Sequence, residues 1–427
     1  MSRKRSVIDL AKISDITMGQ SPSSEHVNTE ERGIPFLQGC AEFGDRSPNP
    51  QYYCSPPLRL APSDSVLISV RAPVGTTNWA DQEYCIGRGL ASVKCINGLS
   101  ITSFIKYSLA LDTSFLGRRS QGSTFLAISA ADLREFPVPV FDILEQGKIA
   151  SILEVTDEAI QKTEALIEKY QKIKVGLMND LFTRGIGADG KLRPSREEVP
   201  ELYQETAIGW IPREWACHKL EDLLSSVSNS IRSGPFGSAL LKSELVEIGI
   251  PFLGIDNVFP ERFEAIFKRF VSEKKYLQLS KYAVRPGDVS ITIMGTVGRS
   301  AVVPSRTGRA LSSKHLWTMT FDTERVEPAL VCWQLNYAPW VKSWFRQQTQ
   351  GGIMDAIQSK TLRNLRLPVP TMSEQKQIHE RYLTLSAKLD GEVSVLNKLK
   401  KQKSGLMQDL LTGKVSVPTP APESTAA

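Results

Sequence analysis

The sequence predicts an α+β fold in which two mixed α/β domains are joined by two long helices that form an antiparallel coiled coil with pseudo-two-fold symmetry. Three observations lead to this prediction: an internal repeat, two heptad patterns and two strand-like alternations. The phrase Gly176-Leu-Met-Asn-Asp-Leu-Phe-Thr183 returns as Gly405-Leu-Met-Gln-Asp-Leu-Leu-Thr412, an offset of 229 residues between positions 176 and 405. A period of this length indicates duplicated domains, because the repeats of solenoid proteins are much shorter.

The composition divides the chain into six predicted segments. The stretch after the first helix is rich in glycine, proline and charge, which is typical of a linker. The end of the chain lacks the apolar residues that a core requires. In order, we predict a first domain over residues 1–141, a helix over 142–183, a linker over 184–213, a second domain over 214–371, a helix over 372–412 and a disordered tail over 413–427.

Strands are predicted inside both domains. Residues 64–70 and 288–294 alternate apolar and polar side chains, and each stretch is followed by a glycine-marked turn and a further apolar stretch. Such alternation is typical of strands with one face in a core. Each domain is therefore expected to contain a twisted, largely antiparallel sheet.

The two long helices are predicted from apolar positions that step alternately by three and four residues, which is a heptad seam. Neither segment contains an internal proline, and Asp142 and Ser373 are the expected N-caps. The first helix leads away from the first domain and the second starts from the second domain, so the pair should run antiparallel. The alternative is that each helix packs only on its own domain.

Charge and composition limit the function classes. The net charge is +6, and residues 214–371 hold 20 basic and 14 acidic side chains, whereas residues 1–142 hold 14 of each. Binding to a polyanion would therefore rely on local patches. The sequence has no apolar run of membrane-spanning length, no Cys-x-x-Cys pair and no metal-ligand spacing of its four histidines, and its basic start is followed by Ser-Val-Ile-Asp, which is not the apolar stretch expected of a signal peptide. We expect a cytoplasmic protein without a membrane or metal partner.

Catalytic motifs are absent from the sequence. It has no Gly-x-x-x-x-Gly-Lys-Ser/Thr loop, no Gly-x-Gly-x-x-Gly loop, no Gly-x-Ser-x-Gly and no His-Glu-x-x-His. Three interpretations stay open: a non-catalytic DNA-reading subunit, a coiled-coil adaptor whose domains bind protein or glycan, and a self-contained nuclease or methyltransferase. The third needs a cofactor or metal site for which the sequence offers no motif.

A set of short motifs in the sequence resembles the motifs of a known protein family. They are Met18-Gly-Gln-Ser-Pro22, Gly33-Ile-Pro-Phe-Leu-Gln-Gly39, Val70-Arg-Ala-Pro-Val-Gly75, Ile86-Gly-Arg-Gly89, Val284-Arg-Pro-Gly-Asp288, Gly295-Thr-Val-Gly-Arg299 and Ser312-Ser-Lys-His-Leu316, together with the paired Gly-Leu-Met-x-Asp-Leu endings. In their order and duplication they closely resemble the specificity subunit of type I restriction-modification enzymes, over nearly the whole chain.

The resemblance implies a subunit that recognises the DNA sequence and does not catalyse the reaction. Each domain would be a target recognition domain that reads one half of a bipartite double-stranded DNA sequence, and the helices would fix the spacing. Two methyltransferase subunits with S-adenosylmethionine and two translocase-nuclease subunits with ATP and Mg²⁺ would complete a type I restriction endonuclease and adenine-specific DNA methyltransferase. This chain itself would hold no cofactor and would not be an enzyme.

Candidate DNA-contacting residues lie beside the glycine-marked turns. Arginine pairs best with guanine and Asn or Gln with adenine, whereas contacts to phosphate mainly position the protein. The alternative for each candidate is an ordinary surface residue, and for His315 a core or capping role. The candidates are Arg71, Thr76, Thr77, Asn78, Arg88, Arg118, Arg119 and Gln121 in the first domain, and Ser233, Lys242, Arg299, Lys314, His315, Arg346, Gln347, Gln348 and Gln350 in the second.

Both seams carry a tyrosine and a lysine. These residues are Tyr170 and Lys174 in the first helix and Tyr382 and Lys403 in the second. One interpretation is a docking surface for the methyltransferase subunits. The other, which we favour for the lysines, is that a seam lysine sets the register of the helix pair or extends its ammonium to the surface.

Overall fold

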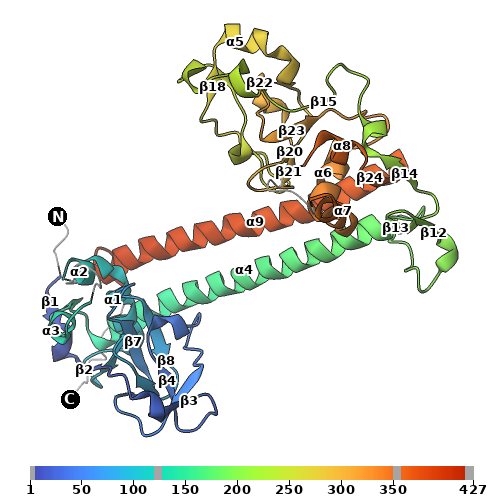
Figure 1. Ribbon diagram of the computed structural model, residues 1–427. Coiled ribbons are helices and arrows are strands. Elements are labelled where there is room, and N and C mark those ends of the chain that lie inside the picture. The colour runs from blue at the N-terminus through green and yellow to red at the C-terminus, as the bar shows by residue number, and fades with distance from the viewer. Residues whose placement is uncertain (1–4, 120–126, 350–356, 419–427) are drawn as a thin grey trace. The chain divides into compact units, whose positions relative to one another are not determined.

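The computed structural model describes residues 5–119, 127–349 and 357–418. These residues form two compact units (Figure 1). Unit 1 consists of Met1–Leu166 and Glu392–Ala427, and unit 2 consists of Ile167–Gly391. Each unit contains a sheet domain, the start of one long helix and the end of the other.

Unit 1 is built on a four-stranded antiparallel sheet. Its order is β2 (Ser14–Met18), β10 (Leu90–Cys95), β7 (Ser65–Ser69) and β8 (Thr77–Ala80). A second sheet has the order β3 (Val27–Asn28), β5 (Tyr52–Cys54), β4 (Ile34–Leu37), β9 (Tyr84–Ile86) and β6 (Leu60–Ala61). A two-stranded sheet pairs β1 (Val7–Asp9) with β11 (Pro137–Pro139).

The helices of unit 1 cover the first sheet and complete its core. They are α1 (Thr102–Leu111), α2 (Thr113–Arg119) and α3 (Ala130–Arg134). Phe104, Ile105 and Leu109 of α1 are fully buried. The same apolar core takes in Ile149 and Leu153 from one long helix and Leu410 and Leu411 from the other, so the start of the first helix and the end of the second belong to the unit.

Unit 2 repeats the strand order of the main sheet of unit 1. Its four-stranded sheet has the order β15 (Ile231–Arg232), β23 (Leu316–Met319), β20 (Val289–Thr292) and β21 (Ser300–Val302), and β14 (Ala216–Lys219) pairs with β24 (Arg366–Val369). Smaller sheets are formed by β16 (Leu245–Val246), β18 (Phe270–Val271) and β17 (Ile250–Pro251), and by β19 (Ala283–Val284) and β22 (Ala310–Leu311). Its helices are α5 (Glu273–Gln278), α6 (Pro328–Tyr337), α7 (Pro339–Thr349) and α8 (Ser359–Arg363). The mixed and largely antiparallel character that the sequence predicted is confirmed in both units.

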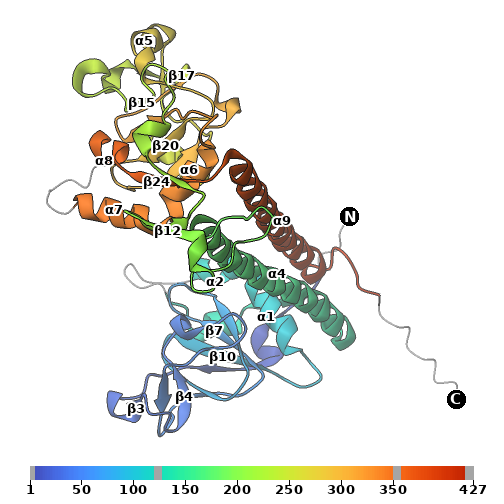
Figure 2. The ribbon, with the colours of Figure 1, turned by 90° about the vertical axis from the view of Figure 1, so that its right-hand side faces the viewer.

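The two long helices are α4 (Ile143–Thr183) and α9 (Met372–Leu411), which pack against each other (Figure 2). In unit 1, Glu164 pairs with Lys400 at 2.7 Å and Asp157 with Lys403 at 2.5 Å, so residue numbers rise along one helix as they fall along the other. In unit 2, Ile378 near the start of α9 packs into one cluster with Leu181 near the end of α4. The helices are therefore antiparallel within each unit. All the predicted seam positions are buried or half-buried.

The helix starts show one correct and one wrong prediction. Asp142 caps α4, because its carboxylate accepts the backbone N–H of Glu145 at 2.8 Å. For α9 the prediction of Ser373 is wrong: the hydroxyl of Thr371 accepts the backbone N–H of Glu374 at 3.4 Å. The helix starts at Met372, immediately after the Pro-Val-Pro-Thr sequence, and this places Ser373 inside its first turn.

The predicted linker contains regular structure. It includes a short helical turn at Pro200–Leu202 and a hairpin of β12 (Tyr203–Thr206) and β13 (Gly209–Pro212). Across the parts of the chain that the structure describes, no helix has the length and apolar character needed to cross a membrane.

Candidate nucleic-acid interface

Two turns meet at the end of the central strand β7 in unit 1. The turn after β7 returns to the strand through a bond from the Ser69 N–H to the Thr76 carbonyl at 2.8 Å. The turn before β10 joins it through a bond from the Val70 N–H to the Gly89 carbonyl at 3.0 Å. The predicted candidates Arg71, Thr76 and Arg88 thus lie on adjacent turns, and all three are exposed.

Unit 2 repeats this arrangement at the end of β20. The Thr292 N–H donates to the Arg299 carbonyl at 2.9 Å, and the Ile293 N–H donates to the His315 carbonyl at 3.0 Å. Arg299, Lys314 and His315 therefore flank one strand end, where Lys314 is exposed and the other two are half-buried. Gly75, Gly295 and Gly298 have φ of +87°, +76° and +90° in these turns, a conformation that favours glycine.

Some predicted residues are placed inside the domains. Asn78 is buried, and its amide donates to the Gly44 carbonyl at 2.8 Å. Thr77 is half-buried on the same strand. Ser233 is only 6% exposed, and its hydroxyl has no hydrogen-bond partner among the residues that the structure describes. Asn78 and Ser233 therefore do not present their polar groups at the surface.

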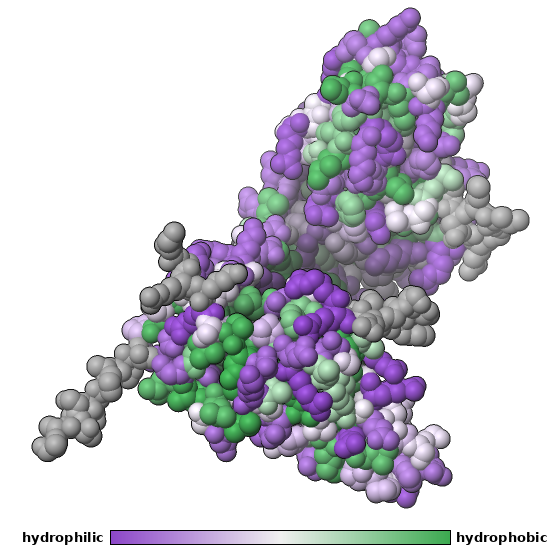
Figure 3. Space-filling model, turned by 90° about the vertical axis from the view of Figure 1, so that its left-hand side faces the viewer, coloured by the Kyte–Doolittle hydropathy of each residue, from purple (hydrophilic) through white to green (hydrophobic). Residues whose placement is uncertain are grey.

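The other candidates lie away from the strand ends. Arg118 and Arg119 end α2; Arg118 donates to the Ser114 hydroxyl at 2.9 Å, and Arg119 pairs with Glu135 at 2.6 Å. Lys242 is exposed in a short helical turn, and Arg346, Gln347 and Gln348 are exposed on α7. Gln121 and Gln350 lie outside the described residues. Figure 3 shows that hydrophilic residues cover much of both units on the face drawn, interrupted by apolar patches.

We expect His315 to stay neutral at pH 7. Burial, together with the neighbouring charges of Lys314 and Arg269, lowers the pKa of His315 below its ordinary value of 6.5. Because the unfolded chain then binds protons more readily, stability from this group is complete above pH 6.5 and falls as the pH drops below it. A titration of the four histidines by NMR, with His315→Gln to assign the signal, should give a midpoint below 6.5. A midpoint above 6.5 would contradict this placement.

A glutamine that was not among the predicted site residues joins each long helix to its domain. Gln146 of α4 donates to the carbonyls of Leu99 and Phe141 at 3.2 and 3.1 Å and accepts the N–H of Ile101 at 3.0 Å, next to the start of α1. In α9, Gln375 donates to the carbonyls of Arg325 and Pro370 at 3.1 and 2.9 Å and accepts the N–H of Glu327 at 2.8 Å, next to the start of α6. Both glutamines are at most 4% exposed, and the repeat offset of 229 could have identified them.

The preceding glutamates hold an arginine in each unit. Glu145 binds Arg5 through contacts of 2.7 and 3.0 Å. Glu374 accepts two bonds from Arg193 at 2.5 and 3.0 Å, one from the Trp215 indole at 2.9 Å and one from the Ile186 N–H at 2.7 Å. The predicted linker is thus fastened to the first turn of α9.

Three of the predicted docking residues are engaged within their units. Lys403 pairs with Asp157, and Lys174 pairs with Glu261 at 2.6 Å. The Tyr382 hydroxyl donates to the same Glu261 carboxylate. Tyr170 is half-buried on the seam of α4. Each of the two lysines therefore pairs with a carboxylate of its own unit.

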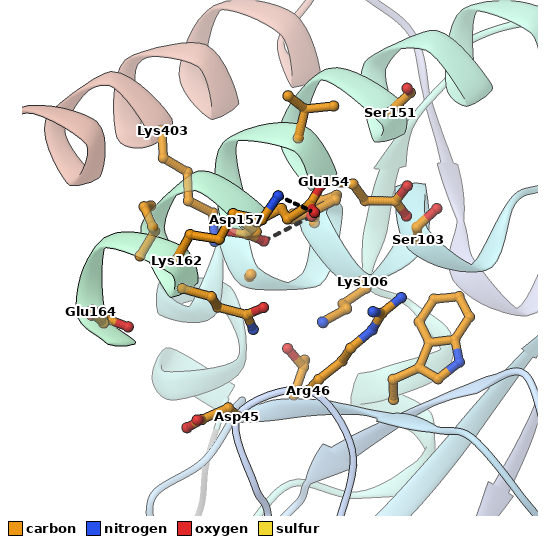
Figure 4. A pocket seen from close by; sticks show the side chains of 18 residues that line it. Asp45, Arg46, Ser103, Lys106, Ser151, Glu154, Asp157, Lys162, Glu164 and Lys403 are labelled. Atoms are coloured by element: carbon orange, nitrogen blue, oxygen red, sulfur yellow. Dashed lines mark hydrogen bonds and ion pairs between the residues drawn. The ribbon is translucent and has the colours of Figure 1, made fainter. Parts of the chain in front are cut away.

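A hollow of about 910 Å³ lies in unit 1 between the sheet domain and α4 (Figure 4). Arg46, Lys106 and Trp79 line it from the domain, and Glu154 and Asp157 line it from α4. Burial lowers the pKa of Lys106, although Asp157 opposes the shift. Among the residues that the structure describes, no group of histidine, cysteine and carboxylate side chains could hold a metal ion. The six cysteines are free thiols.

Comparison with known proteins finds similarity to one protein family. Residues 4–171 match the family model of the type I restriction modification DNA specificity domain. A putative type I restriction enzyme MjaX specificity subunit of Methanocaldococcus jannaschii is 40% identical over 178 residues. Over residues 4–171 the chain is therefore similar to the DNA specificity domain of type I restriction-modification enzymes.

The likeness to type I specificity subunits extends over both halves of the chain. The alignment with the MjaX subunit spans 42% of this chain and 40% of that subunit. The MjaVIII specificity subunit of the same organism is 26% identical over 330 residues, which span 74% of this chain and 70% of that subunit. The crystal structure of the type I S subunit from M. genitalium has 17% identity and a TM-score of 0.58 over 96% of this chain and 97% of that one, which shows a shared fold.

Proposed function

We propose that this chain is the non-catalytic DNA specificity subunit of a type I restriction-modification enzyme. Each target recognition domain reads one half of a bipartite double-stranded DNA sequence, and α4 and α9 set the spacing of the halves. The observation that carries this proposal is the duplicated domain: the two units repeat the strand order of the main sheet and the turns that flank its central strand, but not the side chains on those turns. One scaffold with two different sets of contacts suits a target with two different halves.

The exposed groups at the two strand ends favour DNA reading. Arg71 and Arg88 in unit 1 can offer paired N–H donors to guanine, and Lys314 in unit 2 offers a mobile cation to bases or phosphates. Further exposed basic residues, such as Arg118 and Lys242, suit phosphate contacts that set orientation. Asn78 and Ser233 are less suited, because their side chains are buried.

The partners belong to the same proposal. Two methyltransferase subunits with S-adenosylmethionine and two translocase-nuclease subunits with ATP and Mg²⁺ would supply the chemistry, and the complex would act in the cytoplasm, where the host DNA lies. The exposed flank of the helix pair, away from the seam, offers the area for docking. This includes the outward residues of α9 such as Asn397, Lys398 and Lys401.

Exchanging residues 1–141 for the first domain of a specificity subunit with another target should change only one half of the recognised sequence. The reason is that unit 1 keeps its own core and its own turns at the end of β7. The measurement is a map of methylated positions after co-expression with the methyltransferase subunit. The matched exchange of residues 214–371 should change only the other half. If either exchange left both halves unaltered, or altered both, modular reading would be refuted.

A further inference from the structure

Lys403 and Lys174 each belong to a cluster of one lysine, one carboxylate and one tyrosine. Each cluster joins three elements of one unit. We call Tyr107, Asp157 and Lys403 anchor 1, and Lys174, Glu261 and Tyr382 anchor 2. The two lysines are separated by the repeat offset of 229 residues. The clusters thus occupy equivalent places in the two copies.

Anchor 1 connects the first recognition domain to both helices. The hydroxyl of Tyr107, on α1, donates to the Asp157 carboxylate of α4 at 2.8 Å. Lys403 of α9 binds the same carboxylate at 2.5 Å, and its ammonium lies 5.6 Å from the Tyr107 ring centre. Burial and the bond to Asp157 raise the pKa of Tyr107, so the phenol remains a donor. One carboxylate therefore holds the domain and the second helix together.

Anchor 2 makes the same connection in unit 2. Glu261 lies in the loop closed by the Val258–Phe263 bridge, and its N–H is fixed on the Ser300 carbonyl at 2.9 Å. Its carboxylate accepts from Lys174 of α4 at 2.6 Å and from the Tyr382 hydroxyl of α9. The lysine and glutamate side chains are only 18% and 13% exposed. The backbone of Glu261 has a φ of +62°, an unfavourable conformation for a residue with a side chain, which the surrounding contacts must maintain.

Both anchors consist of a lysine, a carboxylate and a tyrosine, but different elements supply these groups in the two units. In anchor 1 the domain supplies the tyrosine and α4 the carboxylate, whereas in anchor 2 the domain supplies the carboxylate and α9 the tyrosine. At the repeat offset, Asp157 corresponds to Ser386 and Tyr382 to Leu153. The residues have therefore changed between the copies, while the connection from domain to both helices is present in each.

The surroundings of the anchors indicate a positional role. Tyr107, Asp157 and Lys403 line the hollow of about 910 Å³ that lies between the domain and α4 (Figure 4). Tyr107 also belongs to the apolar core of unit 1, together with Phe104 and Leu153, so anchor 1 lies where that core meets the hollow. An ion pair of this exposure adds little to stability, but it can prevent the domain from tilting on the helices.

We propose that anchors 1 and 2 fix the orientation of each recognition domain on the helix pair, and that they thereby restrict the enzyme to one spacing between the half-sites. The inference rests on the proposed function. One base pair corresponds to about 3.4 Å along the duplex, so a small tilt of a domain brings its reading turns to a neighbouring register. Tyr107 and Glu261 act as positioning residues in this account, and neither needs to touch DNA.

The test compares methylation of duplexes whose half-sites have the native gap or a gap one base pair shorter or longer. The complete chain is assembled with its methyltransferase partner as wild type, Tyr107→Phe, Glu261→Gln or Lys403→Met. Each of these variants should lower the ratio of the native-gap rate to the shifted-gap rate by about tenfold, equivalent to about 1.4 kcal/mol, and should keep both half-site sequences. A loss of folded protein would lower both rates together and leave their ratio unchanged.

Two matched variants serve as controls. Glu158→Gln removes an exposed ion pair with Lys162 that lies within α4 and joins no domain, so the ratio should remain that of the wild type. Lys403→Arg keeps the cation beside Asp157 and should preserve the ratio as well. Wild-type ratios in both Tyr107→Phe and Glu261→Gln would overturn the inference. Absence of bipartite methylation by the wild-type complex would instead overturn the proposed function, and the inference with it.

Discussion

Replacing Asp288 with alanine is expected to destabilise the domain of unit 2 by about 3–5 kcal/mol, because it leaves a buried arginine without its counter-ion. Asp288 is fully buried; it pairs with Arg232 and accepts from the Thr320 hydroxyl at 2.5 Å. Arg232 is only 4% exposed and lies on β15 of the main sheet. Burial raises the pKa of Asp288 while Arg232 opposes the shift, so the pair is costly to bury and still more costly to break.

Hydrogen exchange measures this loss locally. Amide protons of β20, which directly follows Asp288, should lose protection, while those of β7 in unit 1 provide an internal reference. Asp256→Ala is the matched control in the same unit, since its ion pairs are about one-third exposed and should contribute at most about 1 kcal/mol. Joint replacement of Arg232 and Asp288 by apolar residues should cost less than the single change. Equal protection of β20 in Asp288→Ala and wild type would refute the assignment.

Replacing Glu374 with alanine should release the segment between α4 and the second domain, with a local loss of about 3–5 kcal/mol. The carboxylate is the common acceptor for Arg193, Trp215 and Ile186, and Arg193 is only 7% exposed in its side chain. Without Glu374, the Trp215 indole and the Ile186 N–H lose their acceptor, while Arg193 keeps Glu214 and the Arg184 carbonyl. Limited proteolysis should then cleave within residues 184–213 at protease concentrations that leave the wild type intact.

Glu214 provides the matched control for Glu374, because it binds the same arginine from the surface. Its contact with Arg193 is 2.6 Å, yet its side chain is 71% exposed. Glu214→Ala should therefore change the stability by less than about 1 kcal/mol and leave proteolysis at the wild-type rate. Equal sensitivity of the two variants would mean that burial is not what makes Glu374 important.

The long-range regularities of the sequence predicted the scaffold well. The heptad steps identified α4 and α9 because a seam is a one-dimensional pattern, and every predicted seam residue is buried or half-buried. The alternation at residues 64–70 and 288–294 identified β7 and β20 for the same reason. The cap prediction missed Thr371, because Ser and Thr both cap helices well and only the backbone conformation decides between them.

Individual site residues were harder to predict, because proximity to a turn does not determine which face a side chain occupies. Asn78 follows Gly75 closely, yet it lies on the inward face of β8 and bonds to Gly44. Glu261 and Glu374 were missed because their partners lie far along the chain: Tyr382 is 121 residues from Glu261, and Ile186 is 188 residues from Glu374. Gln146 and Gln375, and the glutamates before them, Glu145 and Glu374, did leave a readable signal, since both pairs recur at the repeat offset.

The hydrogen bonds of the two glutamines also explain how such a protein can change the DNA sequence that it recognises. Gln146 and Gln375 hold their domains only through backbone carbonyl and N–H groups. Every polypeptide offers those groups, whatever its side chains. A domain that presents the same short backbone loop can therefore make the same glutamine contacts even where its side chains differ.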